Sequence, residues 1–182
     1  MSYDDELKSN NYSTPKRCAN ALKKYLTDSN SHILDIGCGT GLSGQEILNV
    51  GFKNVDGTDF SDKMLYEAKN KNIYKRLFNL DLNSNFYNVN FNYNAIVAAG
   101  IISPHHANPS CLEKCLNILC DSGLLIFSLN DHAVENKNFM DEIFMIVDKN
   151  FEILEKTYGD HLPGIKLNSF VYVIKKLKIK KY

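Results

Sequence analysis

A glycine-rich segment with a carboxylate inside it is the part of the sequence best suited to bind a ligand. It runs from Ile33 to Gly41 and reads Ile-Leu-Asp-Ile-Gly-Cys-Gly-Thr-Gly. Its glycines let the chain turn tightly after an apolar strand and let backbone N–H groups approach a bound molecule. A helix expected from Leu42 would direct its positive end at the same molecule. The segment therefore predicts a small-ligand site at the end of a strand.

Two further carboxylates are expected at the same edge of a sheet. Asp59 follows a second predicted strand, twenty residues after Gly39. At that offset an acid accepts hydrogen bonds from the hydroxyls of a ribose. Asp81 ends a third predicted strand, where it can contact the exocyclic amine of an adenine. The two acids predict a ligand that contains adenosine.

Two classes of ligand compete for this pattern. Gly39, Gly41 and Gly44 match the dinucleotide fingerprint G-x-G-x-x-G, which favours NAD. Asp35 lies two residues before the first glycine, and a carboxylate there would repel a pyrophosphate. S-adenosylmethionine carries an ammonium and a sulfonium but no phosphate, so the same carboxylate favours it. We therefore expect S-adenosylmethionine, with S-adenosylhomocysteine as product, and an NAD-dependent oxidoreductase remains an alternative.

Histidines supply the candidates for acid–base chemistry. His105 and His106 follow the fourth predicted strand, at the edge where open α/β sheets bind ligands. A histidine there can act as a general base near neutral pH, although a pair of solvent-exposed loop residues fits the same pattern. His161 is a weaker candidate, and His32 is expected to be structural because it lies at the opposite edge.

The cysteines predict neither disulfides nor a metal site. Their number is odd and no C-x-x-C pair occurs, which favours a reducing compartment. Cys111 and Cys115 share a predicted helix face near the two loop histidines, a pattern that zinc can use. Buried thiols that pack a helix against a sheet are the commoner use, so we expect no metal.

Apolar periodicity and capping signals predict the elements that position these residues. Thr14 is the expected N-cap of the first helix and Ser61 that of the third. The expected helices are 15–27, 42–50, 61–70, 109–119 and 139–150. The expected strands are 33–36, 54–58, 75–80, 94–100, 123–129, 152–158 and 170–176.

The order of these elements predicts the fold. Strands that alternate with helices indicate a mostly parallel sheet. The last two predicted strands are joined by only about ten residues around Pro163-Gly164, whereas a parallel crossover needs about a dozen or more. We therefore expect an α/β fold with a Rossmann-like doubly wound seven-stranded sheet, mostly parallel with the last strand antiparallel.

Several segments resemble class I S-adenosylmethionine-dependent methyltransferases. Residues 33–41, 55–68 and 94–100 look like the successive motifs of that class. Further segments are similar to the Williams–Beuren syndrome methyltransferase-like group, namely Tyr3-Asp-Asp, Asn11-Tyr-Ser-Thr-Pro15, Ile73-Tyr-Lys-Arg-Leu77 and Ala98-Ala-Gly-Ile-Ile-Ser103. One departure is Asp121-Ser122-Gly123, where the family usually has Pro-Gly-Gly; we expect it to affect only a turn.

The resemblance implies a set of cofactor-binding residues. The methionine moiety would be held by Asp35, Gly37, Gly39 and Gly41. Asp59 would bind the ribose, Phe60 and Met64 would flank the adenine, and Asp81 would contact its amine. The remaining residues expected around the cofactor are Cys38, Leu82 and Ala99.

The acceptor cannot be identified, but its surroundings can be outlined. Tyr3 and Tyr12 are the candidate substrate-binding residues, because a tyrosine gives a pocket an apolar wall with a polar tip. This favours a small-molecule acceptor. We expect one domain over 1–182, with an N-terminal helix and a lid segment in 1–30 and the Rossmann-like core in 31–182.

Composition narrows the partners. The 21 Lys and Arg residues balance the 21 Asp and Glu residues, so nucleic acid is an unlikely partner apart from the basic run 175–181. No apolar run approaches the ~18 residues needed to span a bilayer, and the N-terminus is polar. We expect a cytoplasmic monomer or weak dimer that is either a methyltransferase or a non-catalytic S-adenosylmethionine-binding protein.

Overall fold

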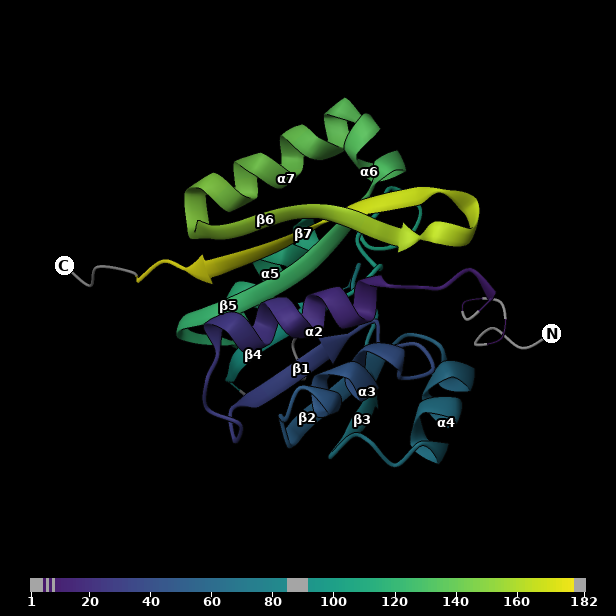
Figure 1. The fold of residues 1–182 in the computed structure, drawn as a ribbon. Coiled ribbons are helices and arrows are strands. Elements are labelled where there is room, and N and C mark those ends of the chain that lie inside the picture. Colours follow the sequence, from purple (N-terminus) through teal and green to yellow (C-terminus); the bar gives the residue numbers. More distant parts are fainter. Residues whose placement is uncertain (1–4, 6, 8, 85–91, 179–182) are drawn as a thin grey trace.

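A seven-stranded sheet runs through the middle of the molecule (Figure 1). The computed structural model describes residues 5, 7, 9–84 and 92–178. Within them the strand order is β3-β2-β1-β4-β5-β7-β6. The strands are β1 (His32–Ile36), β2 (Asn54–Asp59), β3 (Leu77–Asn79), β4 (Tyr93–Ala98), β5 (Leu119–Asn130), β6 (Phe151–Leu162) and β7 (Leu167–Lys176). β1 to β5 pair in parallel, whereas β7 is antiparallel to both neighbours, β5 and β6. The predicted fold is confirmed.

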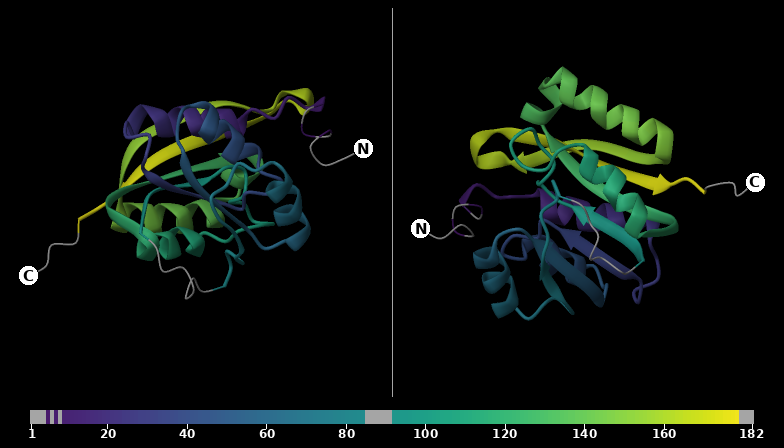
Figure 2. Two further views of the ribbon diagram at one scale, coloured as in Figure 1. Left: turned by 90° about the horizontal axis from the view of Figure 1, so that it is seen from below. Right: turned by 180° about the vertical axis from the view of Figure 1, so that it is seen from behind.

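Helices cover both faces of the sheet. The described helices are α2 (Thr14–Tyr25), α3 (Leu42–Asn49), α4 (Asp62–Asn70), α5 (Ser110–Ile118), α6 (Asp131–Glu135) and α7 (Lys137–Asn150), with a 3-10 turn, η1 (Pro163–Ile165). α2 and α3 lie on one face, and α5 and α7 lie on the other (Figure 2). Neighbouring residues of β1 accordingly pack into different cores, Ile33 with the first pair of helices and Leu34 with the second.

Several element boundaries differ from those predicted. The N-cap of α2 is Ser13 rather than Thr14, because the Thr14 hydroxyl is hydrogen-bonded to His161 Nδ1 at 2.7 Å. β5 begins at Leu119, four residues early, and Ser122 within it has a φ of 60°. β6 and β7 extend into the predicted connection and leave only the turn around η1 between them.

α6 was not predicted at all. It has five residues, too few to show a helical period in the sequence. Asn130 caps it by accepting a hydrogen bond from the Ala133 N–H at 3.0 Å.

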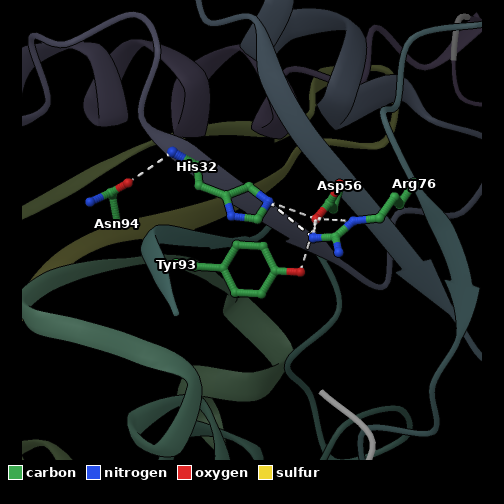
Figure 3. A network of polar contacts seen from close by, with 5 residues as sticks. All are labelled: His32, Asp56, Arg76, Tyr93 and Asn94. Carbon is green, nitrogen blue, oxygen red and sulfur yellow. Dashed lines mark hydrogen bonds and ion pairs between the residues drawn. The ribbon is translucent and has the colours of Figure 1, made fainter. Parts of the chain in front are cut away.

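A polar network lies near the amino-terminal ends of the strands (Figure 3). Asp56 is fully buried, and its Oδ2 is 2.7 Å from His32 Nε2 and 3.0 Å from the Tyr93 hydroxyl. Arg76 donates to the same oxygen from Nε at 3.1 Å and also from Nη2. These bonds lower the pKa of Asp56 in spite of its burial. His32 has the structural role that its position predicted.

None of the helices in the described ranges is long and apolar enough to cross a membrane.

Candidate active site

Two adjoining cavities open at the carboxyl ends of β1, β2 and β4. The turn cavity has a volume of about 330 Å³ and lies between the glycine turn and Tyr12. The loop cavity, of about 360 Å³, is lined by Asp81 and His105. Both are lined by Asp59, and the strand order reverses between β1 and β4 beside them. Open α/β sheets bind their ligands at this position.

The glycine turn requires glycine for steric reasons. Gly37 has a φ of 63°, a left-handed conformation that disfavours a side chain. A Cβ at Gly37 would also lie only 2.5 Å from the Ile101 side chain. The turn is tied to β2 by the Cys38 N–H, which donates to the Thr58 carbonyl at 2.9 Å. The backbone of the turn consequently forms one wall of the turn cavity.

Asp59 holds the turn and faces both cavities. Its Oδ2 accepts from the Gly39 N–H at 2.9 Å, and its Oδ1 accepts from the Ser61 N–H at 2.9 Å. Its exposed fraction is 7%. A carboxylate oxygen has room for more than one donor, so Asp59 can still receive hydroxyl groups of a ligand.

Asp35 lies beneath the turn and lines neither cavity. It is fully buried and accepts hydrogen bonds from the Ser43 hydroxyl at 2.5 Å and the Tyr74 hydroxyl at 2.6 Å. Its Oδ1 has no partner among the described residues. Burial raises the pKa of Asp35 to about 6. Its direct contact with a methionine moiety stays a prediction.

Tyr74 explains the third glycine of the dinucleotide-like pattern. A Cβ at Gly44 would collide with the phenol ring of Tyr74, which must pass there to reach Asp35. Gly44 is therefore needed to seat a tyrosine beneath the turn, and no dinucleotide is required to explain it. Sequence reasoning assigned Tyr74 no role at the site, although it lies in one of the segments that carried the resemblance.

The residues predicted to surround an adenine are divided between the two cavities. Phe60 is 69% exposed, and it lines both cavities. Asp81 accepts from the Asn83 N–H at 2.9 Å, as in a plain turn, and also lines the cavity. Leu82 is buried beside it, and Met64 lines the turn cavity.

Asn83 was missed by sequence reasoning. Its side chain donates to the His106 carbonyl at 3.0 Å and accepts from the Asn108 N–H at 2.9 Å. It thereby joins the loop after β3 to the loop after β4. A lone asparagine in a polar loop carries no signal for such a role.

Tyr12 closes one side of the turn cavity. Its hydroxyl is 3.5 Å from the carbonyl oxygen of Ala99, another cavity residue. Its ring lies edge-on to His161, with 5.2 Å between the ring centres. Tyr3, the other candidate substrate residue, lies outside the described residues.

The loop histidines are exposed, and His161 is not. His106 lines both cavities, and its Nδ1 lies 2.8 Å from the Ser103 hydroxyl. His105 lines the loop cavity but not the turn cavity. His161 is 7% exposed. Burial, and then the positive charge of Arg17, lowers the pKa of His161 to about 4.

The candidate zinc ligands pack into the core. Cys111 and Cys115 are fully buried between α5 and the sheet, and burial raises the pKa of Cys111 to about 12. Across the described part of the chain, no three His, Cys, Asp or Glu side chains come together as a metal site would need.

The charge of the site limits its ligand. Asp59 and Asp81 line the two cavities, and no Lys or Arg of the described ranges does so. A pyrophosphate would meet carboxylates without a cation to balance it. The residues fit an adenosine ligand that is positively charged and has no phosphate, as S-adenosylmethionine is.

The fold is that of class I S-adenosylmethionine-dependent methyltransferases, and the site fits S-adenosylmethionine. Residues 33–123 match the family model of the methyltransferase domain, and the chain belongs to that family. S-adenosylmethionine is the cofactor that this membership implies.

The similarity to individual proteins is limited either in the length matched or in the sequence identity. The chain is 34% identical over 77 residues to human methyltransferase-like protein 27, a match that covers 41% of this chain and 31% of that protein. A solved structure from Listeria monocytogenes, named as a class I S-adenosylmethionine-dependent methyltransferase, has a TM-score of 0.70 at 15% identity and covers 96% of this chain and 63% of its own. A TehB-like methyltransferase from Corynebacterium glutamicum has a TM-score of 0.63 at 19% identity, covering 92% and 88%. These two structures share the fold.

Proposed function

We propose that this protein transfers the methyl group of S-adenosylmethionine to a small-molecule acceptor. The observation that carries the proposal is the pair of adjoining cavities lined by Asp59 and Asp81 and by no lysine or arginine of the described residues. When bound, the cofactor would supply a methyl group already activated by its sulfonium.

The residues of the chain would hold the two ends of the cofactor. Asp59 would accept the ribose hydroxyls, while Phe60, Met64 and Asp81 would surround the adenine. The methionine end would lie along the glycine turn, above Asp35. Support for this orientation comes from the loop cavity, which contains Asp81, and from the turn cavity, which contains the backbone of Gly39.

Methyl transfer depends mainly on how the acceptor is placed. Holding two reactants close and aligned accounts for a large part of the rate of such a reaction. The turn cavity is lined near the carboxyl end of β4 by Tyr12, Gly100 and Ile101. These residues would exclude water there. If the acceptor atom carries a proton, His106 or His105 would receive it.

Ligand choice is the first test of this proposal. S-adenosylhomocysteine should raise the melting temperature of the purified protein in proportion to its occupancy, and NAD at the same concentration should not. Stabilisation by NAD alone would contradict the proposal. Incubation with methyl-labelled cofactor and a small-molecule extract, followed by isolation of a labelled product, separates catalysis from binding without turnover.

Asp59→Asn tests the orientation of the cofactor. The amide keeps one oxygen for the turn but cannot accept from two ribose hydroxyls. Loss of a hydrogen bond to a charged group is worth about 1.5–3 kcal/mol, so affinity for S-adenosylhomocysteine should fall roughly tenfold to hundredfold. Isothermal titration calorimetry measures this. Asp62→Ala, which removes a neighbouring carboxylate that lines neither cavity, is the control; equal losses in both variants would remove Asp59 from the site.

A further inference from the structure

A third cavity adjoins the turn cavity and is rich in histidine. This histidine cavity has a volume of about 210 Å³ and shares Gly100 and His106 with the turn cavity. Its other walls include His105, His132 and His161. The volume corresponds to about seven water molecules at the density of the liquid. It is a space for a small molecule next to the proposed methyl donor.

The histidine cavity has no negative side chain in its described lining. Asp131 lies beside it, but its carboxylate accepts from the Tyr158 hydroxyl at 2.9 Å and from the Asn168 N–H at 3.0 Å, and it does not line the cavity. The described lining also lacks lysine and arginine. Recognition must therefore come from hydrogen bonds and from imidazole rings.

Asn130 presents a hydrogen-bond donor to this cavity. A backbone N–H can only donate, so the side-chain atom that caps the Ala133 N–H at 3.0 Å must be the amide oxygen. The amide nitrogen therefore faces away from the Ala133 N–H, and it makes no hydrogen bond to the described residues. Asn130 lines the histidine cavity, which places an N–H₂ group in its wall.

His161 is the second group in this wall that can donate, and a chain of hydrogen bonds reaches its Nδ1. Arg17 Nη1 donates to the Ser169 hydroxyl at 2.8 Å, and a guanidinium cannot accept. Ser169 can then direct its own proton to its other described partner, the Thr14 hydroxyl at 3.4 Å. In that arrangement the Thr14 hydroxyl donates to His161 Nδ1, which lies 2.7 Å from it. A neutral imidazole that accepts at Nδ1 carries its proton on Nε2.

Two side chains that can donate, from distant parts of the chain, thus line one small cavity whose described lining has no anion. We propose that the histidine cavity binds the methyl acceptor, and that the acceptor carries a carboxylate received by Asn130 Nδ2 and His161 Nε2–H. The identification of this ligand as the acceptor rests on the proposed function. Thr14, which contacts His161, and Ser169, which contacts Thr14, act as positioning residues, since neither lines the cavity.

The tautomer of His161 is the first quantity to measure. Long-range ¹H–¹⁵N NMR correlations distinguish a proton on Nε2 from one on Nδ1. The Nε2–H form is expected in the intact protein and in Thr14→Ser, which keeps the hydroxyl. Thr14→Val removes the hydroxyl and should release this preference. A proton on Nδ1 in the intact protein would overturn the proposal.

Benzoate and benzamide are matched probes for the carboxylate. Titrated into protein saturated with S-adenosylhomocysteine, benzoate should shift the amide signals of Gly100, Asn130 and His161. Benzamide, of similar shape but neutral, should bind at least tenfold more weakly. Equal binding of the two probes, or displacement of S-adenosylhomocysteine by benzoate, would contradict the proposal.

Two variants test the donors independently. Asn130→Asp keeps a cap for α6 but replaces the donor with a negative charge, and His161→Phe keeps the ring but removes the N–H. Each should weaken benzoate binding at least tenfold while leaving the affinity for S-adenosylhomocysteine within twofold. Unchanged benzoate binding in either variant would contradict the assignment of that residue as a donor to the carboxylate. If S-adenosylhomocysteine fails to bind the intact protein while benzoate still depends on both donors, the proposed function fails and the carboxylate site stands.

Discussion

Asp35 and His161 are buried near the same pair of cavities, and their titrations affect folding in opposite directions. The pKa of Asp35 is raised to about 6 by burial, so its favourable contribution is present at low pH and is lost as the pH rises through 6. The pKa of His161 is lowered to about 4, so its contribution is present above about pH 6.5 and is lost as the pH falls through 4. Each shift corresponds to about 3 kcal/mol, and the two largely offset each other between pH 4 and 6.5.

Asp35→Asn should expose the titration of His161. The free energy of unfolding of this variant, relative to the intact protein, should increase by about 3 kcal/mol between pH 4 and pH 7. Urea unfolding across this range measures the difference. Asp148→Asn, which removes an exposed carboxylate on α7, serves as the control. Parallel curves for Asp35→Asn and the intact protein would show that Asp35 does not titrate in this window.

Among single residues, the sequence could identify only those whose role depends on neighbours close by in the chain. Asp35 and Asp59 stand at characteristic distances from the glycines, and both lie at the turn as predicted. His161 was ranked below the loop histidines, because its partner Thr14 is 147 positions away in the chain. Tyr74 and Asn83 were missed for the same reason: their hydrogen bonds join segments that only the folded sheet brings together.

Among the elements, β5 contains a residue in a strained conformation. Ser122 has a φ of 60°, and a left-handed conformation costs about 1–2 kcal/mol for a residue with a Cβ. A Cβ at the next residue, Gly123, would lie 2.9 Å from the Cys120 carbonyl oxygen. The departure from Pro-Gly-Gly therefore lies inside β5 and not in the expected turn, and it places a serine where glycine fits better.

Ser122→Gly should stabilise the protein. Relief of the left-handed conformation is partly offset by the greater flexibility of glycine in the unfolded chain, about 0.5–1 kcal/mol. A net gain of about 0.5–1 kcal/mol is expected in chemical denaturation. Ser122→Ala shows whether the hydroxyl matters, because it keeps the Cβ and should give no gain. Loss of stability in Ser122→Gly would mean that the backbone there is not strained.

The types of the longer elements could be predicted from the sequence, while several of their ends could not. Apolar periodicity identified α2, α5 and α7 because each buries one face in the described structure. The start of β5 includes a polar segment, Cys120 to Ser122, that falls in a break of the register with β4 and precedes the pairing with β7. β6 likewise runs on through exposed residues, for which hydrophobic patterning provides no signal.

On the scale of the whole molecule, the carboxyl and amino ends of the strands carry different features. The carboxyl edge holds the turn, loop and histidine cavities, whereas the buried carboxylate of Asp56 is bonded to His32, Arg76 and Tyr93 near the other edge (Figure 3). Topology made this division predictable, because parallel strands bring all their carboxyl ends to one side. The partners of Asp56 come from three different segments and could not be inferred.

Asp56→Asn should weaken folding and spare the ligand site. Removal of the charge leaves Arg76 without its buried partner, and the free energy of unfolding should fall by about 2–4 kcal/mol. Affinity for S-adenosylhomocysteine should stay within twofold at a temperature where the variant is folded. Lys137→Ala breaks an exposed ion pair with Asp141 and should change stability by less than about 0.5 kcal/mol. A large loss of affinity in Asp56→Asn would show that the two edges are coupled.

The position of β7 between β5 and β6 also bears on how the protein is made. A ribosome releases β5 and β6 before β7, so the nascent chain exposes one apolar edge of β5 for the time needed to synthesise the next segments. Domains tend to assemble from the N-terminal side during synthesis, and the walls of the turn cavity come from residues 7–106. We expect the part of the fold that lines the turn cavity to form first. Until β7 is made, the edge of β5 stays unpaired and is prone to pair with other chains. A released chain that ends at residue 162 should therefore aggregate more readily than one that extends to residue 176 and includes β7.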